Sequence, residues 1–409
     1  MFVAEMRRRE VTRPALVTPP FVLVVVSTFA YFLCVGMLFP VFPFFIEGPL
    51  HGSDVAVGLS GGAFSLSAVL LRPWAGRLGD RRGRRPLMVI GSAIVATAVL
   101  ANRAVDSLAM LMSLRLIAGV GEALFFVGAA AAVNDLAPEE RRGEAVSLFS
   151  LALYGGISFG PIVGEALFEA TSFDTVWLTS AATGAAATVL AVRVRDARPE
   201  RGAGPPPRLV HPAGVLPGLV LFCAVWGFAA FNSFVALYAK EDLAMSGSRF
   251  VFFTYSFTVL LIRLFGARIP DILGSRRAAS IATTTITGGM LIIALWQQPA
   301  GLYLGAFVFG VGQAFAFPAL MTLAVRGAPA HERGAVVGTY SAFVDLAFGA
   351  GAVAMGPVAH SFGYPATFAV SAVFALAGLG LLRLRVPDDR PRRRAVAEIE
   401  CPPAESGHL

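Results

Sequence analysis

Four charged residues stand inside long apolar runs, where each charge is costly and therefore indicates a function. Arg115 and Glu122 share one run, Glu165 stands in the next, and Asp345 stands in the sequence SAFVDLAFGAGAV. An apolar wall favours the neutral form of a carboxyl group, so such an acid can take up and release a proton near neutral pH. The predicted chemistry is therefore proton binding. For each acid, the alternative is a carboxylate that only hydrogen-bonds a neighbouring helix.

The spacing of these charges says which of them can act together. Arg115 and Glu122 are seven residues apart, which places them on one face of a helix. The rise between them is about 10 Å, so they need not touch each other. Two more arginines, Arg72 and Arg263, also stand in apolar runs. We expect these two to extend to the cytoplasmic membrane surface, because a long arginine side chain can place its charge among the lipid headgroups.

One arginine-rich sequence occurs twice and divides the chain into two halves. It reads LRPWAGRLGDRRGRRPL at residues 71–87 and IRLFGARIPDILGSRRA at residues 262–278. The copies are offset by 191 residues, the separation of Arg72 from Arg263. The same offset relates Asp80 to Asp271, Gly83 to Gly274, and Tyr154 to Asp345. Such a repeat predicts two similar units of six helices with a binding site between them.

The composition indicates a membrane protein. Of 409 residues, 56% are hydrophobic and 14% are charged, and the mean hydropathy is +0.70, which excludes an ordinary soluble domain. About twelve apolar runs reach the roughly 20 residues that a membrane-spanning helix needs. The first run, residues 21–46, is expected to be one retained helix and not a cleaved signal peptide. We therefore predict an all-α membrane protein, with twelve transmembrane helices in two pseudo-symmetric six-helix bundles.

Arginines gather in alternate connections between the runs, which predicts that both chain termini are cytoplasmic. The net charge of +7 comes from these short clusters, so we expect no nucleic-acid partner. The three cysteines indicate neither a metal site nor a disulfide framework, and we expect no cofactor. The expected segments are a cytoplasmic tail at 1–20, a six-helix bundle at 21–194, a cytoplasmic linker rich in proline and glycine at 195–213, a second bundle at 214–385 and a tail at 386–409.

Three motifs, all in the first half, make the chain resemble the major facilitator superfamily, and within it the twelve-helix drug:proton antiporters. The family's signature G-x-x-x-D-R-x-G-R-R is matched in full from Gly76 to Arg85. Its helix-4 signature, R-x-x-x-G-x-G, is matched by Arg115, Gly119 and Gly121. The resemblance covers essentially the whole chain and implies the twelve-helix fold.

A third motif is the helix-5 antiporter signature G-x-x-x-G-P-x-x-G-G. It is matched by Gly156, Gly160, Pro161 and Gly164, but Glu165 replaces the last glycine. A proline inside a helix removes a hydrogen bond and bends the helix, and glycines allow close contact. The resemblance implies that this bend is sealed against helix 8, at the contact between the halves. The alternative is ordinary packing of small residues.

The resemblance also implies a gate on the cytoplasmic side. Gly76 would let the helix at 55–76 approach the helix that begins near Gly334. Asp80 would lie at the N-terminus of that second helix, where negative charge is favoured. Arg84 or Arg85 would pair with Asp135. The expected gate residues are Gly76, Asp80, Gly83, Arg84, Arg85, Asp135 and, in the second copy, Asp271. The alternative is that the arginines only set the orientation of the helices.

The same family's helix-4 arginine is implicated in proton coupling, and Arg115 stands at that position. We therefore expect proton coupling from Asp345, Glu122, Arg115 and Glu165. Bulky aromatic residues and amides inside a span suit a cavity for apolar compounds. The expected cavity residues are Phe126, Tyr154, Phe228, Phe231, Asn232 and Gln313. The alternative is that the phenylalanines face lipid or pack between helices.

These features together predict a proton-coupled efflux transporter in the inner (plasma) membrane. Its partners would be protons, the lipid bilayer and a small drug-like compound or secondary metabolite, and a monomer is expected. The alternative is a proton symporter that imports a sugar or organic acid, because the fold permits both directions. We expect no enzyme, since the sequence contains no nucleophile–base pair, HExxH motif or P-loop.

Overall fold

The computed structural model describes residues 15–138, 141–195, 210–266, 272–326, 328 and 332–386. These residues are helical apart from short turns, and none of them lies in a strand. Eleven of the helices are long and apolar enough to cross a membrane. A further helix, α10 (Arg249–Phe265), has 17 residues and stands between them in chain order. The prediction of a twelve-helix, all-α membrane fold is confirmed.

The first half begins with a broken helix. Its elements are α2 (Pro19–Met37), α3 (Val41–Glu47), α4 (Asp54–Arg82), α5 (Arg84–Ala101), the short η1 (Asn102–Ala104), α6 (Leu108–Leu136), α7 (Arg142–Ala170) and α8 (Phe173–Val192). The predicted first helix at 21–46 is thus two helices, because Pro40 in the turn between them has no backbone N–H to continue the ladder. Helix α4 continues beyond the predicted end at residue 76 and contains Pro73.

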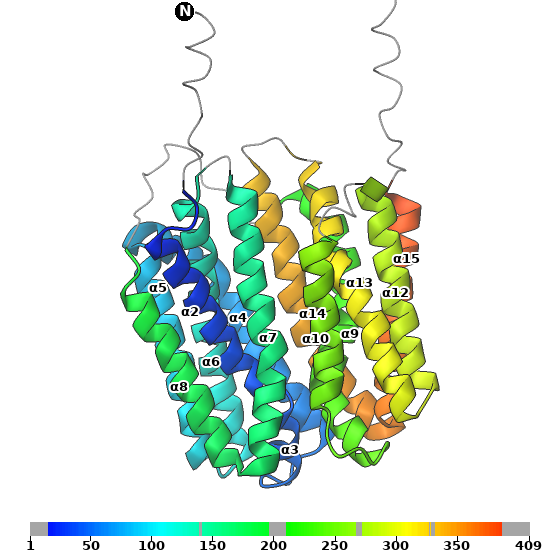
Figure 1. Cartoon of the computed structure of the whole chain (residues 1–409). Coiled ribbons are helices and arrows are strands. Elements are labelled where there is room, and N and C mark those ends of the chain that lie inside the picture. The colour runs from blue at the N-terminus through cyan, green and yellow to red at the C-terminus, as the bar shows by residue number, and fades with distance from the viewer. Residues whose placement is uncertain are drawn as a thin grey trace, which may run out of the picture.

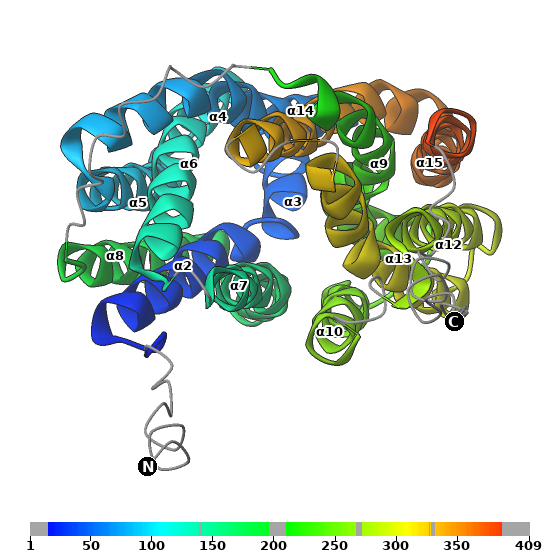
Figure 2. The same ribbon diagram turned by 90° about the horizontal axis from the view of Figure 1, so that it is seen from above.

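The second half repeats this order with six helices. They are α9 (Pro212–Glu241), α10, α12 (Ser275–Leu295), α13 (Pro299–Arg326), α14 (Arg333–Phe362) and α15 (Tyr364–Arg385). Helices α2–α8 gather on one side of the molecule and α9–α15 on the other (Figure 2). The halves meet mainly through two helix pairs, α4 with α14 and α7 with α10. The predicted linker lies largely outside the described residues.

The bundle has two ends that the chain itself distinguishes. Helix α2 begins and α15 ends on the same side of the bundle (Figure 1). We call this the terminal side and the opposite end the far side. Gly83, between α4 and α5, and Gly274, before α12, lie on the terminal side with φ of +94° and +83°. Only glycine adopts such angles easily, and both copies of the repeated motif make this turn.

Packing inside the halves follows the repeat as well. A Cβ on Gly121 of α6 would lie 2.7 Å from the carbonyl oxygen of Gly91 in α5. At the equivalent place in the second half, a Cβ on Gly312 of α13 would lie 2.7 Å from the carbonyl oxygen of Ala282 in α12. In both halves a glycine therefore lets two backbones meet, as small residues do in membrane helix pairs.

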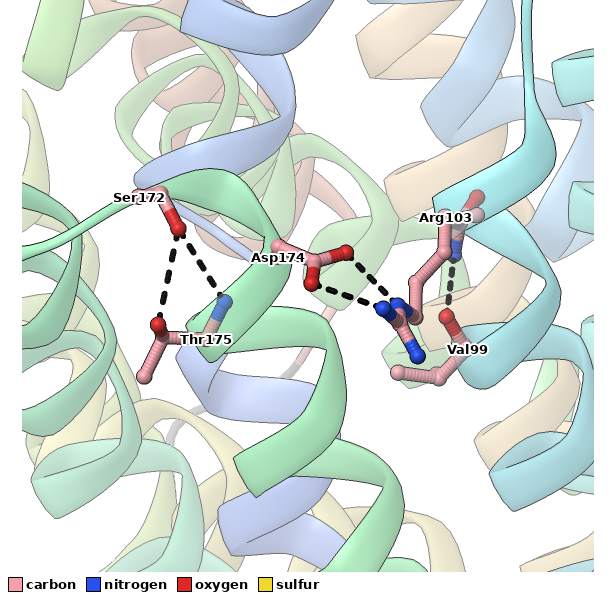
Figure 3. Close-up of polar contacts among 6 residues, drawn as sticks. Val99, Arg103, Ser172, Asp174 and Thr175 are labelled. Atoms are coloured by element: carbon pink, nitrogen blue, oxygen red, sulfur yellow. Dashed lines mark hydrogen bonds and ion pairs between the residues drawn. The ribbon is translucent and has the colours of Figure 1, made fainter.

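On the far side an ion pair joins two helices of the first half. Arg103, which follows α5, donates from Nε and Nη2 to the two carboxylate oxygens of Asp174 in α8, at 2.6 and 2.8 Å (Figure 3). Nearby, Ser172 caps the start of α8 by accepting a hydrogen bond from the backbone N–H of Thr175. Both charged side chains are nearly half exposed, so this pair adds little stability.

Candidate functional site

An ion pair crosses the contact between the halves. Nη1 of Arg72 in α4 meets Oδ2 of Asp345 in α14, and only 18% of each side chain is exposed. The guanidinium carbon of Arg72 also lies 4.5 Å from the ring centre of Phe126 in α6. The expectation that Arg72 extends to the membrane surface is therefore wrong. The arginine turns inward because a carboxylate and an aromatic face are both within its reach there.

A second acid lies beside this pair. Glu122 of α6 is 7% exposed, and its carboxyl group interacts electrostatically with Tyr31 of α2, Arg72 and Asp345. Oε2 of Glu122 and the hydroxyl of Tyr31 are buried without a hydrogen bond of ordinary geometry in the described part of the chain. We call Tyr31, Arg72, Glu122 and Asp345 the central charge cluster. The sequence predicts both acids as functional residues, but neither Arg72 nor Tyr31.

The charge of this cluster favours a bound proton. With both acids ionised, its two negative charges and one positive charge sum to −1. Burying an unbalanced charge in an apolar region is unfavourable, so one proton on either acid brings the cluster to neutrality. Protonation of Asp345 would also remove its attraction to Arg72. The cluster can therefore link the uptake of a proton to the contact between α4 and α14.

Arg115, the third predicted proton-coupling residue, lies outside this cluster. Its guanidinium carbon lies 4.6 Å from the ring centre of Phe42 and 4.7 Å from that of Phe64. Nε of Arg115 donates to the carbonyl oxygen of Ser60 at 3.1 Å. Among the residues that the structure describes, no carboxylate forms an ion pair with it. The structure thus places Arg115 between α3 and α4, as a contact of the first half.

Arg263 occupies the repeat-equivalent position of Arg72, at the other contact between the halves. Its guanidinium carbon lies 3.7 Å from the ring centre of Tyr154 in α7. Tyr255 and Tyr340 are also close enough to interact electrostatically with Arg263. Nε of Arg263 is buried and has no hydrogen-bond partner within the described ranges. Tyr154, a predicted cavity residue, thus faces a guanidinium group across the interface.

Glu165 acts at the far side and is not brought to the other two acids. Its carboxylate accepts hydrogen bonds from the backbone N–H of Ser248 at 2.6 Å and from the Ser248 hydroxyl at 2.9 Å. Ser248 precedes α10, so this contact joins the two halves. One turn further along α7, Glu169 pairs with Arg249 at 2.8 Å. We call these four residues the far-side clamp.

The α4–α14 contact is also tight towards the far side. A Cβ on Gly356 of α14 would lie 2.9 Å from the carbonyl oxygen of Asp54 in α4. A Cβ on Gly58 would collide with the backbone of Ala352. Nδ1 of His360 lies 3.9 Å from Oδ2 of Asp54. Together with the far-side clamp, these contacts hold the halves together on the far side.

On the terminal side, the printed interactions of the predicted gate residue Arg84 stay within the first half. Arg84 donates to Asp80 at 2.8 Å and to Asp135 at 3.0 Å, and all three belong to the first half. A Cβ on Gly76 would meet no atom within 4 Å, so α4 and α14 do not approach closely there. Arg85 is exposed, and Gly83 makes the turn before α5. Asp271 lies outside the described residues.

The helix-5 motif packs against a different helix from the one we expected. A Cβ on Gly156 of α7 would lie 2.7 Å from the backbone nitrogen of Leu33, and one on Gly160 would lie 2.6 Å from Cα of Gly36. Gly164 is equally close to Met37, so all three glycines face α2 in the same half. Pro161 stands inside the continuous helix α7. The glycines therefore seal α7 to α2, while Glu165 and Glu169 reach α10.

The remaining predicted cavity residues divide between the two halves. Phe126 holds the guanidinium group of Arg72. Phe231 is fully buried among aromatic rings of the second half, and the amide of Asn232 donates to the carbonyl oxygen of Phe228. Gln313 donates to a carbonyl oxygen of α9 at 3.4 Å. Phe228 and Phe348 lie 5.8 Å apart between ring centres, and Phe348 in turn approaches Phe39 of the first half.

Comparisons with known proteins agree with this architecture. The family model of the Major Facilitator Superfamily matches residues 24–238 and 217–405. An uncharacterized MFS-type transporter of Salmonella typhimurium is 26% identical over 370 residues, which cover 88% of this chain and 94% of that protein. One of Burkholderia mallei is 28% identical over 396 residues, covering 90% and 93%.

Solved structures show the same fold at lower identity. The nucleoside transporter NupG has a TM-score of 0.72 at 13% identity, covering 90% of this chain and 98% of NupG. The human organic anion transporter MFSD10 has a TM-score of 0.70 at 21% identity, covering 89% and 99%. These two likenesses show the fold. The family match covers both halves, and the chain therefore belongs to the major facilitator superfamily of membrane transporters.

Proposed function

We propose that this protein is a proton-coupled efflux transporter, which exchanges an inbound proton for an outbound small, largely apolar organic molecule by alternating access. The observation that carries this proposal is the Arg72–Asp345 ion pair across the halves, with Glu122 beside it. A proton on Asp345 removes one charge of the pair. Proton uptake would thereby weaken a contact that must change when the halves move.

The conformation supports a cycle of this kind. The halves are held together on the far side and stand apart at Gly76 on the terminal side. With cytoplasmic termini, as the arginine distribution predicts, this is the inward-open form that loads a substrate from the cytoplasm. The Arg72–Asp345 pair is formed here, which requires an ionised Asp345. That is the charge state expected after a proton has been released inside.

The proposed direction of transport rests on the motif in α7. The proposed kind of substrate rests on the aromatic residues near the contact between the halves. The Gly156–Gly164 region matches the antiporter signature apart from Glu165. Phe39, Phe228 and Phe348 form a chain of rings across the interface, which suits a bulky apolar compound. We place the protein in the inner (plasma) membrane as a monomer, with protons and the organic compound as its only cargo.

A second candidate is a proton symporter that imports a small nutrient. One observation favours it: the last glycine of the antiporter signature is Glu165, and this acid closes the far side by binding Ser248. Because Glu165 replaces this glycine, the helix surface here differs from the one that the antiporter signature is expected to provide. Import of an organic acid or sugar would use the same central charge cluster, with proton and substrate moving in the same direction.

Proteoliposomes with a pH-sensitive dye inside would test both candidates. The interior is made acidic and compounds are added outside, one at a time. Antiport predicts proton efflux on addition of a compound, with accumulation of that compound inside. Asp345→Asn and Glu122→Gln should each lower this exchange, whereas Glu144→Gln, a change in an exposed pair with Arg141, should not.

The outcomes separate the candidates. Uptake that requires an acidic exterior, with protons entering beside the compound, would contradict efflux and support the symporter. Proton exchange that is unchanged in both Asp345→Asn and Glu122→Gln would contradict a coupling role for the central charge cluster. Loss in only one variant would identify the acid that exchanges the proton.

A further inference from the structure

Arg263 carries a positive charge that no described carboxylate balances. It belongs to the last turn of α10, at the contact between the halves, and its partner in the structure is the face of the Tyr154 ring. A cation over an aromatic ring gains about 0.5–2 kcal/mol, which is less than a charge needs when it leaves water for the interior of a membrane protein. The remaining requirement is for an anion.

The repeat-equivalent arginine has the anion that Arg263 lacks. Arg72 pairs with Asp345 of the opposite half, and the 191-residue offset converts Asp345 into Tyr154. Both arginines therefore face the same position of the opposite half. At one interface the position is an acid, and at the other it is an aromatic ring. An acid that pairs with Arg263 must therefore come from somewhere other than the position of Tyr154.

The surroundings of Arg263 are aromatic as well as positive. Tyr154 of α7 lies against its guanidinium group, and Tyr255 of α10 and Tyr340 of α14 are near enough to interact with it electrostatically. The hydroxyl of Tyr340 donates to the carbonyl oxygen of Phe317, so its ring is held in place. Ring faces suit a flat apolar body, and the guanidinium group suits a carboxylate, which it binds with two parallel N–H donors.

We propose that Arg263 binds the acidic group of the transported molecule, and that this molecule is an aromatic or similarly apolar monoanion whose ring system lies among the three tyrosines. One face of the guanidinium group rests on Tyr154, which leaves its edge for the carboxylate. Nε at that edge is buried and has no hydrogen-bond partner in the described chain. The inference rests on the proposed transport function, and it holds for either direction of transport.

Matched compound pairs test this assignment without requiring proton movement. The probes are benzoate, 2-naphthoate and 4-phenylbenzoate, each beside its carboxamide, and the readout is the Tm of the detergent-solubilised full chain. We expect the larger carboxylates to raise Tm. Their carboxamides should need at least a tenfold higher concentration for the same rise in Tm. In Arg263→Gln the preference for the carboxylate should disappear, while Arg263→Lys should retain part of it. Arg277→Gln, at an exposed arginine on α12, is the matched control.

A second variant keeps the test decisive if Arg263→Gln folds poorly. Tyr154→Asp gives the second interface the acid that Asp345 gives the first, and it leaves Arg263 in place. The new carboxylate should occupy the guanidinium group and abolish the preference for added carboxylates. Equal effects of the two members of each pair in the wild type, or a preference that survives in both variants, would overturn the proposal.

The two proposals fail separately. If proton exchange is absent from proteoliposomes but the carboxylate preference depends on Arg263, then the anion site stands and the coupling proposal is wrong. If proton exchange occurs and the wild type does not prefer carboxylates, then only the anion site is wrong. Binding is measured at one pH and without a gradient, so the coupling of protons does not enter the result.

Discussion

The two contacts between the halves use repeat-equivalent arginines in two ways. At the α4–α14 contact Arg72 meets a carboxylate, and at the α7–α10 contact Arg263 meets the face of Tyr154. A proton can remove the first interaction by neutralising Asp345, but it leaves the attraction between an arginine and a ring unchanged. In the proposed cycle, the first interface therefore responds to protons, and the second offers its charge to the acidic group of the transported molecule.

The largest expected effect follows from removing the acid at the first contact. Asp345→Asn leaves Arg72 without its carboxylate, and breaking a buried ion pair costs about 3–5 kcal/mol. We expect pH-driven transport to fall by about 100-fold or more in proteoliposomes, since 1.4 kcal/mol corresponds to a factor of ten. Arg72→Gln should behave alike. Transport at the wild-type rate in either variant would remove the difference between the two interfaces.

The far-side clamp provides the next test, because it belongs to the α7–α10 contact. Glu165→Gln replaces two charge-assisted hydrogen bonds to Ser248 and should weaken the clamp by about 1.5–3 kcal/mol. We expect the population with an open far side to increase by about 10- to 100-fold, since 1.4 kcal/mol corresponds to a factor of ten. Spin labels at Thr171 and Ser246, in a background without the native cysteines, should report longer distances. An unchanged distance distribution would mean that packing alone closes this side.

A double variant measures how strongly the first contact depends on its charges. Arg72→Gln with Asp345→Asn removes both partners, so neither is left buried and unbalanced. The loss of Tm in the double variant should be smaller than the sum of the two single losses. Expressed as a free energy, the interaction between the two side chains should be about 0.5–3 kcal/mol. Additive losses would show that the two side chains stabilise the fold independently and do not act as a pair.

The smallest effect is expected at an ion pair that lies within one half. Arg103 and Asp174 meet at 2.6 Å, but their side chains are 44% and 49% exposed. Solvent screens such pairs, so Arg103→Gln should leave both Tm and transport unchanged within error. A clear loss of transport would show that the far side of the first half contributes to the cycle through α5 and α8.

Much of the fold could be predicted because a bilayer imposes it. Apolar runs of about 20 residues indicate membrane-spanning helices whichever helices become their neighbours, and a glycine such as Gly83 between two runs indicates a turn for the same reason. Both acids of the central charge cluster were predicted for a similar reason, since a charge inside an apolar run is conspicuous. The neighbours of these groups were harder to predict, because packing between distant segments decides them.

Arg72 illustrates that limit. Its partner Asp345 is 273 residues away, and position within one helix indicated only that the arginine could reach the surface. The repeat did contain the signal, because its offset relates Arg72 to Arg263 and Asp345 to Tyr154. Once one contact is known, the offset therefore predicts where the other lies, but the offset alone does not say which residues meet. Likewise, glycine spacing in α7 predicted a close helix contact, but it could not say that α2 would be the neighbour.

The close contact of Gly160 with Gly36 has a mechanical consequence. Two helices whose backbones touch cannot slide past each other without a collision, so α7 must move together with α2. Helix α7 has 29 residues and is therefore about 43 Å long. Because α7 packs closely against α2 and is hydrogen-bonded to Ser248 near its far end, we expect it to move as a rigid rod that pivots at that end. A rotation of about 10° around the far-side clamp would displace its other end by about 7 Å over that length.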